Sequence, residues 1–161
     1  MFNKYTTQGF GVVEIIVAIS IISLTVVGLF NATVVSFQTI SDNTKRIQAT
    51  FLLEETIEVL KVLRDQSWAV RIATVSTNTD QFLTFNGTQW RTTNDNIFID
   101  DIFERKFQIT DVYRDSNDDI VSSGGTLDSN TKKVTSSVAW ASRSGTTTIS
   151  ASTYITNLSS N

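Results

Sequence analysis

One carboxylate stands alone in the longest apolar stretch of the chain. Glu14 is the only charged side chain among residues 10–30, which are otherwise apolar, small or hydroxyl-bearing. On insertion scales, a carboxylate deep in a membrane costs about 2.5–3.5 kcal/mol. Glu14 therefore needs a functional or structural reason to stand at this position.

The stretch around Glu14 has the length of a membrane-spanning helix. At a rise of about 1.5 Å per residue, residues 10–30 extend about 30 Å, which matches the hydrocarbon thickness of a bilayer. Its apolar character continues to Phe37, so we expect the spanning helix to comprise residues 10–37. A short polar leader, residues 1–9, precedes it, and Lys4 in that leader favours an amino terminus on the cytoplasmic side.

Residues 9–19, with the sequence GFGVVEIIVAI, resemble the signal of type IV prepilins, which type IV pilins and type II secretion pseudopilins share. In that family a peptidase cuts after the glycine, the new amine is methylated, and the glutamate pairs with the amino terminus of a neighbouring subunit. The resemblance implies cleavage between Gly9 and Phe10, N-methylation of Phe10, and an assembly role for Glu14. Pairing with an ammonium group also offsets part of the cost of burying the carboxylate.

The same resemblance implies a function for the whole chain. It implies a structural subunit, not an enzyme, of a type IV pilus (a fimbrium) or of a pseudopilus for protein secretion. Its partners would be other pilin or pseudopilin subunits, the prepilin peptidase and an inner-membrane assembly platform. We expect a single-pass protein of the cytoplasmic membrane with an extracytoplasmic head, residues 38–161. Several motifs in this head resemble minor pilins or minor pseudopilins more loosely: Glu54-Glu55, Arg64-Asp65, Trp68, and TKKV at residues 131–134.

Three other interpretations account for part of the same pattern. An uncleaved single-span surface protein, either an adhesin or a sensor, explains the length of the stretch but not the Gly9–Phe10 junction or Glu14. A secretory signal peptide has an apolar core of about 7–15 residues, followed by a cleavage site. A membrane-tethered enzyme would need a catalytic constellation in the head, and the sequence offers none that we can identify.

Beyond Phe37 the apolar pattern narrows to a stripe with helical spacing. No glycine or proline interrupts residues 29–71, so the sequence predicts one continuous helix of more than 50 residues. Apolar or small side chains recur three or four residues apart on one face, and charged side chains occupy the other. The stripe comprises Ala49, Leu53, Thr56, Leu60 and Leu63, with Ile57 beside them; the charged face comprises Lys45, Arg46, Glu54, Glu55, Glu58, Lys61 and Arg64.

After Trp68 the sequence has the signals of strands and turns. Residues 81–85 and 89–92 flank Asn86-Gly87, a favoured hairpin turn. Further strands are expected at 102–112, 134–140 and 146–158, with turns at 115–119, 122–125, 128–130 and 142–145. A long helix followed by antiparallel strands is an α+β arrangement, in which the amphipathic half of the helix packs on the sheet. This order of elements also resembles pilins.

Composition limits the chemistry that the head can perform. The chain has no histidine and no cysteine, which removes the commonest metal ligands, the usual general base and the thiol nucleophile. A net charge of −3 gives no broad basic surface for nucleic acid. We therefore expect no cofactor, no small-molecule substrate and no nucleic-acid partner. Trp68, Trp90 and Trp140 are interpreted as packing aromatics.

Two groups of carboxylates remain to be explained. Asp115, Asn117 and Asp119 follow the D-x-N-x-D opening of a calcium loop, but the positions for its glycine and its final glutamate hold Ile120 and Thr126. An EF-hand is excluded; a solvated turn is favoured, and an irregular calcium site stays open as an alternative. The carboxylates of residues 54, 55 and 58 are interpreted as a salt-linked, exposed helix face.

Overall fold

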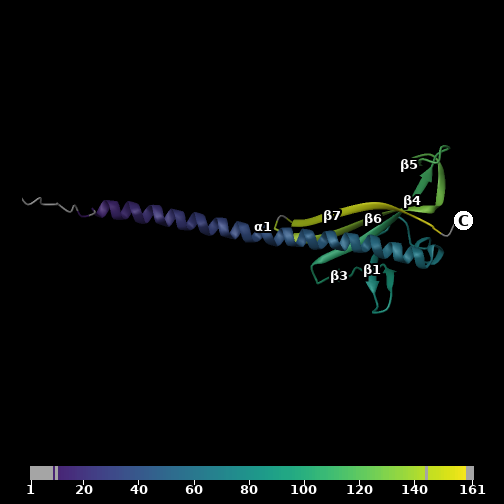
Figure 1. The fold of residues 1–161 in the computed structure, drawn as a ribbon, viewed down its shortest axis with the longest axis horizontal. Coiled ribbons are helices and arrows are strands. Elements are labelled where there is room, and N and C mark those ends of the chain that lie inside the picture. The colour runs from purple at the N-terminus through teal and green to yellow at the C-terminus, as the bar shows by residue number, and fades with distance from the viewer. Residues whose placement is uncertain (1–8, 10, 144, 159–161) are drawn as a thin grey trace, which may run out of the picture. The chain divides into compact units, whose positions relative to one another are not determined.

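The computed structural model describes Gly9, residues 11–143 and residues 145–158. A single α-helix, α1 (Val12–Gln66), is followed by a short π-helix, η1 (Trp68–Ile72), and then only by strands (Figure 1). The strands are β1 (Phe82–Phe85), β2 (Trp90–Thr93), β3 (Phe98–Ile99), β4 (Phe103–Arg114), β5 (Ile120–Val121), β6 (Thr126–Ser142) and β7 (Gly145–Thr156). The α+β class that the sequence predicts is confirmed.

The long helix is continuous for 55 residues, as the absence of helix breakers predicts. The chain nevertheless divides into two compact units, Met1–Asn43 and Thr44–Asn161, and the division falls within α1. We call the second unit the head. The first buried position on α1 is Ala49, so the part of α1 that contributes to a core belongs to the head.

One face of α1 in the head is buried on the sheet. The buried residues follow the predicted stripe, with Val59 in addition, while Ile57 is only half-buried. Thr56 fits among apolar neighbours because its hydroxyl donates to the Leu52 carbonyl at 2.8 Å, which leaves no unpaired donor. The stripe comprises Ala49, Leu53, Thr56, Val59, Leu60 and Leu63.

The π-helix η1 is a feature that the sequence did not predict. It is capped by Ser67, whose hydroxyl accepts from the Val70 amide at 3.3 Å, and it closes with the Ala73 amide donating to the Trp68 carbonyl at 2.9 Å. Buried Ile72 and half-buried Trp68 both pack on the core from this turn. The short π-helix thus follows the end of α1 with both side chains packed on the core.

The head contains two antiparallel sheets. β1 and β2 form a hairpin, in which Phe85 pairs with Trp90 across the predicted Asn86-Gly87 turn. The larger sheet has the order β3-β4-β6-β7, and β5 pairs with the end of β4. In this sheet Phe103 lies opposite Trp140, and Trp140 lies opposite Thr147. β4, β6 and β7 are the strands expected at 102–112, 134–140 and 146–158, and β6 is longer than expected.

The predicted turn at residues 128–130 is wrong. These residues lie inside β6, where the register with β4 shifts between Asp111, opposite Lys132, and Val112, opposite Asp128. The polar residues of this segment therefore mark a bulge, which supplies the same change of direction without ending the strand.

Two groups of buried side chains form the core between α1 and the larger sheet. One contains Leu60, Leu63, Phe107, Ile109 and Ile155; the other contains Ala49, Leu53, Phe103, Val138 and Trp140. Trp68 and Trp90 pack partly buried against the first group. The interpretation of the three tryptophans as packing aromatics is thus confirmed.

Candidate functional site in the first turn and apolar half of the long helix

Glu14 lies in the first turn of α1, where it caps the helix. The helix begins at Val12, and the Glu14 Oε2 atom accepts a hydrogen bond from the backbone amide of Gly11 at 2.9 Å. A glutamate that reaches back from the third helical position to the preceding amide is half of a capping box. The carboxylate is also favoured by the positive end of the helix dipole. Glu14 thus has a local structural role.

The capping hydrogen bond uses only one of the two carboxylate oxygens, Oε2. Glu14 is exposed, and no described residue donates to its second oxygen, Oε1. The side chain points back toward the start of the chain, since its partner is the amide just after Phe10. A cation brought to this end of the helix would find an oxygen available.

Of the two residues of the expected cleavage site, the structure describes only Gly9. Gly9 precedes the helix, is exposed, and has nothing within 4 Å of the position that a Cβ would take. Gly9 therefore lies outside regular structure. Phe10 lies outside the described residues.

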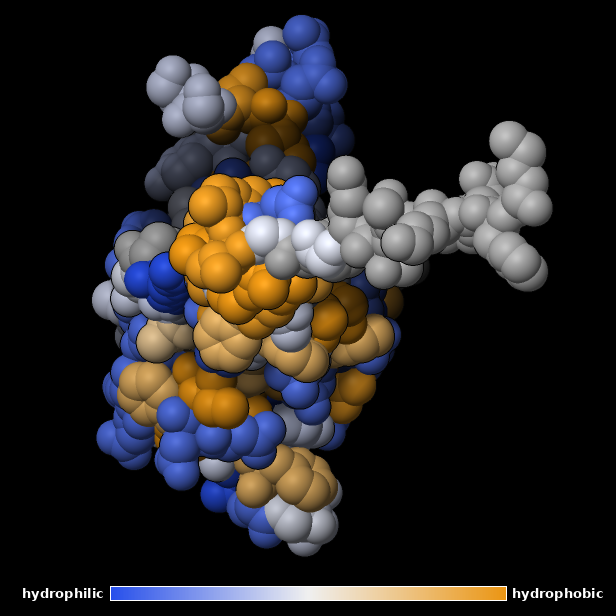
Figure 2. Space-filling view, turned by 90° about the vertical axis from the view of Figure 1, so that its left-hand side faces the viewer, coloured by the Kyte–Doolittle hydropathy of each residue, from blue (hydrophilic) through white to orange (hydrophobic). Residues whose placement is uncertain are grey.

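The apolar half of α1 has no core of its own. Every residue from 11 to 44 is exposed, including large side chains such as Leu24, which is 75% exposed, and Phe30, which is 69% exposed. Figure 2 shows apolar side chains, in orange, gathered on the part of the helix that faces the viewer. An apolar surface on all sides of a helix is stable only in a bilayer or among other apolar helices.

The hydroxyl side chains between residues 12 and 39 are satisfied within the helix. Every serine and threonine between residues 12 and 39 donates its hydroxyl proton to the carbonyl four residues earlier, at 2.8–3.0 Å. In hydrocarbon an unpaired hydroxyl would cost several kcal/mol, on the order of 4–8 on the cyclohexane scale. These bonds therefore let Ser20, Ser23, Thr25, Thr33, Ser36 and Thr39 enter an apolar environment.

By length and composition, α1 is the one helix in the described parts of the chain that could cross a membrane. This agrees with a single-pass membrane anchor.

The head holds a buried ion pair that sequence reasoning missed. Arg105 lies on the inner face of β4 between Phe103 and Phe107, with its side chain 5% exposed, and it donates to the carboxylate of Glu55 on α1. Its guanidinium also lies 5.5 Å from the centre of the Trp90 ring. Burial lowers the pKa of Arg105, and the charge of Glu55 opposes that change.

The interpretation of the carboxylates of residues 54, 55 and 58 as a salt-linked, exposed face holds in part. Glu54 and Glu58 are exposed, and Glu55, 43% exposed, is salt-linked to Arg105 on β4, which sequence reasoning did not identify as its partner. Arg64 pairs with its neighbour Asp65 at 2.7 Å. The signal was present in the sequence: Arg105 falls in the apolar phase of the alternating strand.

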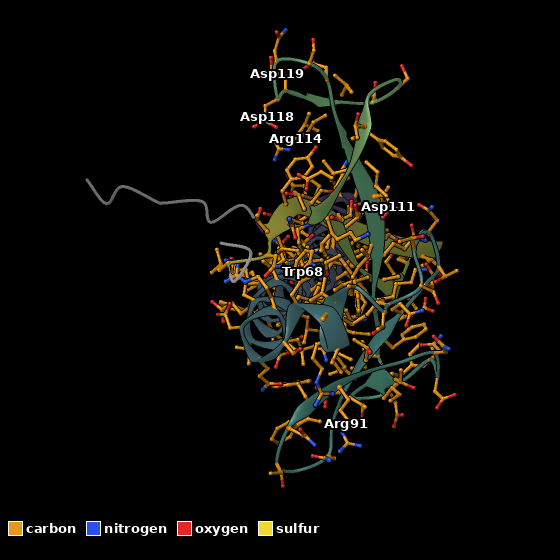
Figure 3. The ribbon with its side chains drawn as sticks, turned by 90° about the vertical axis from the view of Figure 1, so that its right-hand side faces the viewer. Trp68, Arg91, Asp111, Arg114, Asp118 and Asp119 are labelled. Carbon is orange, nitrogen blue, oxygen red and sulfur yellow. The ribbon has the colours of Figure 1, made fainter. Side chains whose placement is uncertain are left out.

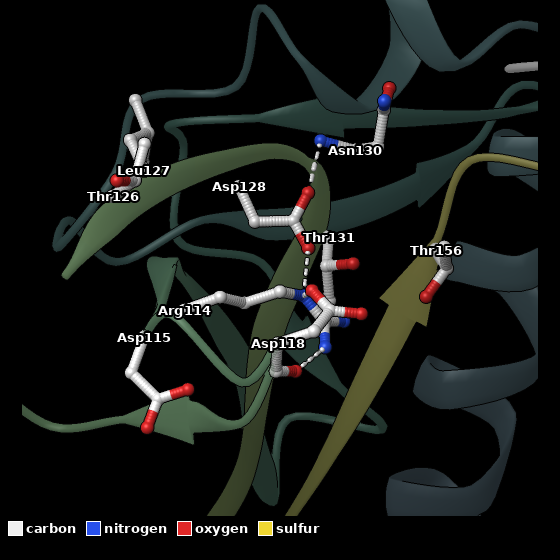
Figure 4. Close-up of a pocket in the computed structure, with 9 residues that line it drawn as sticks. All are labelled: Arg114, Asp115, Asp118, Thr126, Leu127, Asp128, Asn130, Thr131 and Thr156. Atoms are coloured by element: carbon white, nitrogen blue, oxygen red, sulfur yellow. Dashed lines mark hydrogen bonds and ion pairs between the residues drawn. The ribbon is translucent and has the colours of Figure 1, made fainter.

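The acidic loop is organised around an arginine. Arg114 Nε donates to Asp128 at 2.7 Å and its Nη1 donates to the Asp118 carbonyl at 2.7 Å (Figure 4). The hydrogen bond from Arg114 is the main cause that holds the pKa of Asp128 below its usual range. Figure 3 places Arg114, Asp118 and Asp119 together at one end of the head, away from Arg91 on β2.

The residues considered for a calcium site form hydrogen bonds with one another within their turn. One oxygen of Asp115 accepts from the amides of Asn117 at 2.8 Å and of Asp119 at 3.0 Å. Among the described residues no three acidic side chains come together in a way that could hold a metal ion. The geometry is that of a solvated turn closed by its own side chain.

Comparison of the chain with protein-family models, with curated proteins and with solved structures finds no match.

Proposed function

We propose that this chain is a structural subunit of a type IV pilus or of a type II secretion pseudopilus. In this proposal it is made as a prepilin in the cytoplasmic membrane, with its amino terminus in the cytoplasm and its head outside. It is cut after Gly9 and methylated at Phe10. Its partners are the prepilin peptidase, the inner-membrane assembly platform and other subunits, and it performs no catalysis itself.

The observation that carries the proposal is the division of α1. One half buries its stripe in the head, while the other exposes apolar side chains on all sides and pairs its hydroxyls internally. A bilayer satisfies such a surface before assembly, and the equivalent helices of other subunits satisfy it afterwards. One helix can therefore serve both as anchor and as filament core.

Glu14 supplies the register between subunits in this proposal. Its Oε2 atom holds the Gly11 amide, and its Oε1 atom carries no bond from a described residue. An ammonium group at the amino terminus of a neighbouring subunit would form an ion pair with this second oxygen. In an apolar surrounding such a pair is strong, because leaving either charge alone is costly.

The capping bond also supports a second candidate, an uncleaved single-span surface protein. The bond from Gly11 gives Glu14 a reason to be present without any assembly. In that case the amino terminus would stay intact at Met1.

The test measures processing and assembly separately. Mass spectrometry of the protein from native membranes should give a mature chain of 152 residues (161 − 9) that starts at a methylated Phe10. An intact Met1 would favour the single-span surface protein. A mature start at any other residue would contradict both candidates.

Assembly is tested with Glu14→Gln, which keeps the size of the side chain and removes its charge. We expect normal membrane levels and leader cleavage but a strong loss from sheared filaments. Glu14→Asp should assemble partially, because it keeps the charge with a shorter reach. The matched control is Asp42→Asn, at an exposed carboxylate farther along α1, which should assemble normally. Full assembly of Glu14→Gln would leave the carboxylate with only its capping role.

A further inference from the structure

β7 forms an uncovered edge of the larger sheet. It pairs with β6 along its whole length, from Thr156 opposite Thr131 to Gly145 opposite Ser142. On its other side, no strand and no backbone hydrogen bond from the described residues reaches it. Figure 1 shows β7, in yellow, along one border of the head. Its outer amides and carbonyls therefore form a row of unpaired donors and acceptors.

The opposite edge of the same sheet is covered piece by piece. Along β4, Phe103 and Glu104 pair with β3, and Tyr113 and Arg114 pair with β5. Between them, Phe107 exchanges two hydrogen bonds of 2.9 Å with Gln81, and the Ile109 carbonyl accepts from Asn78 at 2.8 Å. The fold thus protects one edge of its sheet and leaves the other open.

β7 also lacks the features that normally prevent edge pairing. Residues 145–156 contain no charged side chain and no proline, and their register with β6 has no shift. Natural edge strands usually carry lysine, proline or a bulge, because a long, regular, uncharged edge pairs with other strands. The bulge between Asp111 and Val112 interrupts the ladder of β4 with β6, not that of β6 with β7.

The inner face of β7 is incompletely buried. Ile149 and Ala151 pack against the core group around Leu53 and Trp140, but both stay half-buried. A strand added beyond β7 would cover the side of these residues that faces away from β6. The missing neighbour is therefore a strand in the same sheet.

We propose that β7 pairs antiparallel with β7 of a second copy of this chain, about a two-fold axis at Ser150 or Ala151, so that two sheets become one. The β4 edge is covered by β3, by β5 and by residues 78–81, which leaves β7 as the longest open strand edge among the described residues. Pairing of β7 with β7 of a second copy is a contact of like with like, which closes as a dimer.

The sequence of β7 suits this self-pairing. With the axis at Ser150, Thr148 lies opposite Ser152 of the second copy, and Thr147 lies opposite Thr153. Hydroxyl side chains opposite one another stabilise antiparallel pairs, and no like charges meet. The contact requires only the head and does not rest on the proposed filament. Subunits of one filament point the same way, so in a filament this contact would join two filaments.

The absence of cysteine from the natural sequence allows a direct test. Single cysteines are placed at Thr148, Ser150, Ala151 or Ser152 in the full-length chain, which is then oxidised mildly in native membranes. A residue on the two-fold axis faces its own copy at about 4.5–5.5 Å between Cα atoms, a distance that a disulfide spans. We expect disulfide-linked dimers with a maximum at position 150 or 151.

Ser137→Cys is the matched control, because Ser137 lies directly opposite Ser150 on the neighbouring strand β6. Across the paired sheet its copy would lie three strand spacings away, about 14 Å, too far for a disulfide. Equal yields at positions 137 and 150, no dimer at any β7 position, or a disulfide to a different protein would each overturn the proposal.

A second pair of variants separates pairing from chance collision. Thr148→Lys with Ser152→Lys puts like charges opposite each other across the axis, and should lower the dimer yield of Ser150→Cys several-fold. Thr135→Lys with Ala139→Lys places the same charges one strand inward, on β6, where these positions lie opposite Ser152 and Thr148 of β7. This pair should leave the yield unchanged. Equal yields from the two sets would overturn the proposal.

Discussion

Arg105 brings a guanidinium to the inner face of the sheet, where most positions are apolar. The side chain is tolerated because the Glu55 carboxylate balances its charge and the Trp90 ring lies against its guanidinium. Its alkyl part is buried among apolar side chains. The pair links α1 to β4, and the ring contact links β4 to the β1–β2 hairpin. One residue therefore connects three parts of the head.

Removing the charge of Glu55 should destabilise the head. Glu55→Gln leaves the guanidinium of Arg105 buried without a counter-charge, and we expect a loss of about 1–3 kcal/mol. The value lies below that of a fully buried pair because Glu55 is 43% exposed. The measurement is denaturant unfolding monitored by tryptophan fluorescence, to which Trp90 beside Arg105 contributes.

The control for this change is Glu54→Gln, at the adjacent exposed carboxylate, which should shift stability by less than about 0.5 kcal/mol. Equal effects of the two substitutions would mean that the ion pair contributes nothing beyond surface charge.

Among the elements, the sequence predicted those whose hydrophobic period is regular. The stripe from Ala49 to Leu63 predicted the packed face of α1, and Val134 to Trp140 predicted the inner face of β6. The hairpin followed from Asn86-Gly87, where Gly87 adopts φ of 88°. Regular periods suffice because burial of one face dictates both the element and its orientation.

The elements that sequence missed depend on contacts between distant residues. The polar residues 128–130 read as a turn, yet pairing with β4 holds them in a strand with a bulge. The salt link of Glu55 was expected on its own helix, yet its partner Arg105 is fifty residues away on β4.

The β5–β6 connection depends on a glycine that has no room for a side chain. Gly125 has φ of 108°, and a Cβ there would lie 2.6 Å from the Arg114 carbonyl oxygen and 3.0 Å from Val121. Gly125→Ala should therefore cost about 2 kcal/mol or more, through backbone strain and displacement of β5. Denaturant unfolding measures the loss.

The neighbouring glycine provides the comparison. Gly124 has φ of 66° with open space around it, so Gly124→Ala should cost only about 1 kcal/mol, the ordinary penalty of a left-handed residue. Equal losses at the two positions would show that the close approach to Arg114 does not constrain the turn.

Carboxylates at both ends of β4 should make the head sensitive to acid. The pKa of Asp80 is lowered mainly by its hydrogen bond from Lys106, and that of Asp128 mainly by its hydrogen bond from Arg114. A carboxyl whose pKa is lower in the fold stabilises it above the ordinary value of about 4, and this contribution is lost as pH falls through the folded pKa. Stability should therefore decrease below about pH 4.

This acid sensitivity can be assigned with one substitution. Asp128→Asn should be less stable than the natural protein at neutral pH, and the difference should shrink as pH falls below about 4. Glu58→Gln, at an exposed carboxylate with no ion pair among the described residues, is the control and should change stability at neutral pH by less than about 0.5 kcal/mol. Unfolding midpoints across this range decide the question, and a constant difference for Asp128→Asn would contradict the assignment.

At the scale of the whole molecule, one helix carries two different surfaces. Its first half offers apolar side chains in every direction and, between residues 12 and 39, pairs each serine or threonine hydroxyl with a carbonyl of its own backbone. Its second half buries a single stripe and keeps charges on the other face. No proline or glycine separates the two halves at the division between Asn43 and Thr44. The difference between their surfaces is therefore encoded in the side chains alone.

The head should therefore fold without the apolar half of α1. A fragment of residues 38–161 keeps every buried position of the helix, from Ala49 onward, and every strand. Such a length is sufficient for a single hydrophobic core. We expect a soluble protein with the circular dichroism of mixed helix and sheet and one cooperative unfolding transition. As a control, residues 68–161 lack the stripe that covers Phe107, Val138 and Trp140, and should be insoluble or unfolded. If residues 38–161 are also insoluble or unfolded, the second half of α1 and the sheet do not form an independent core.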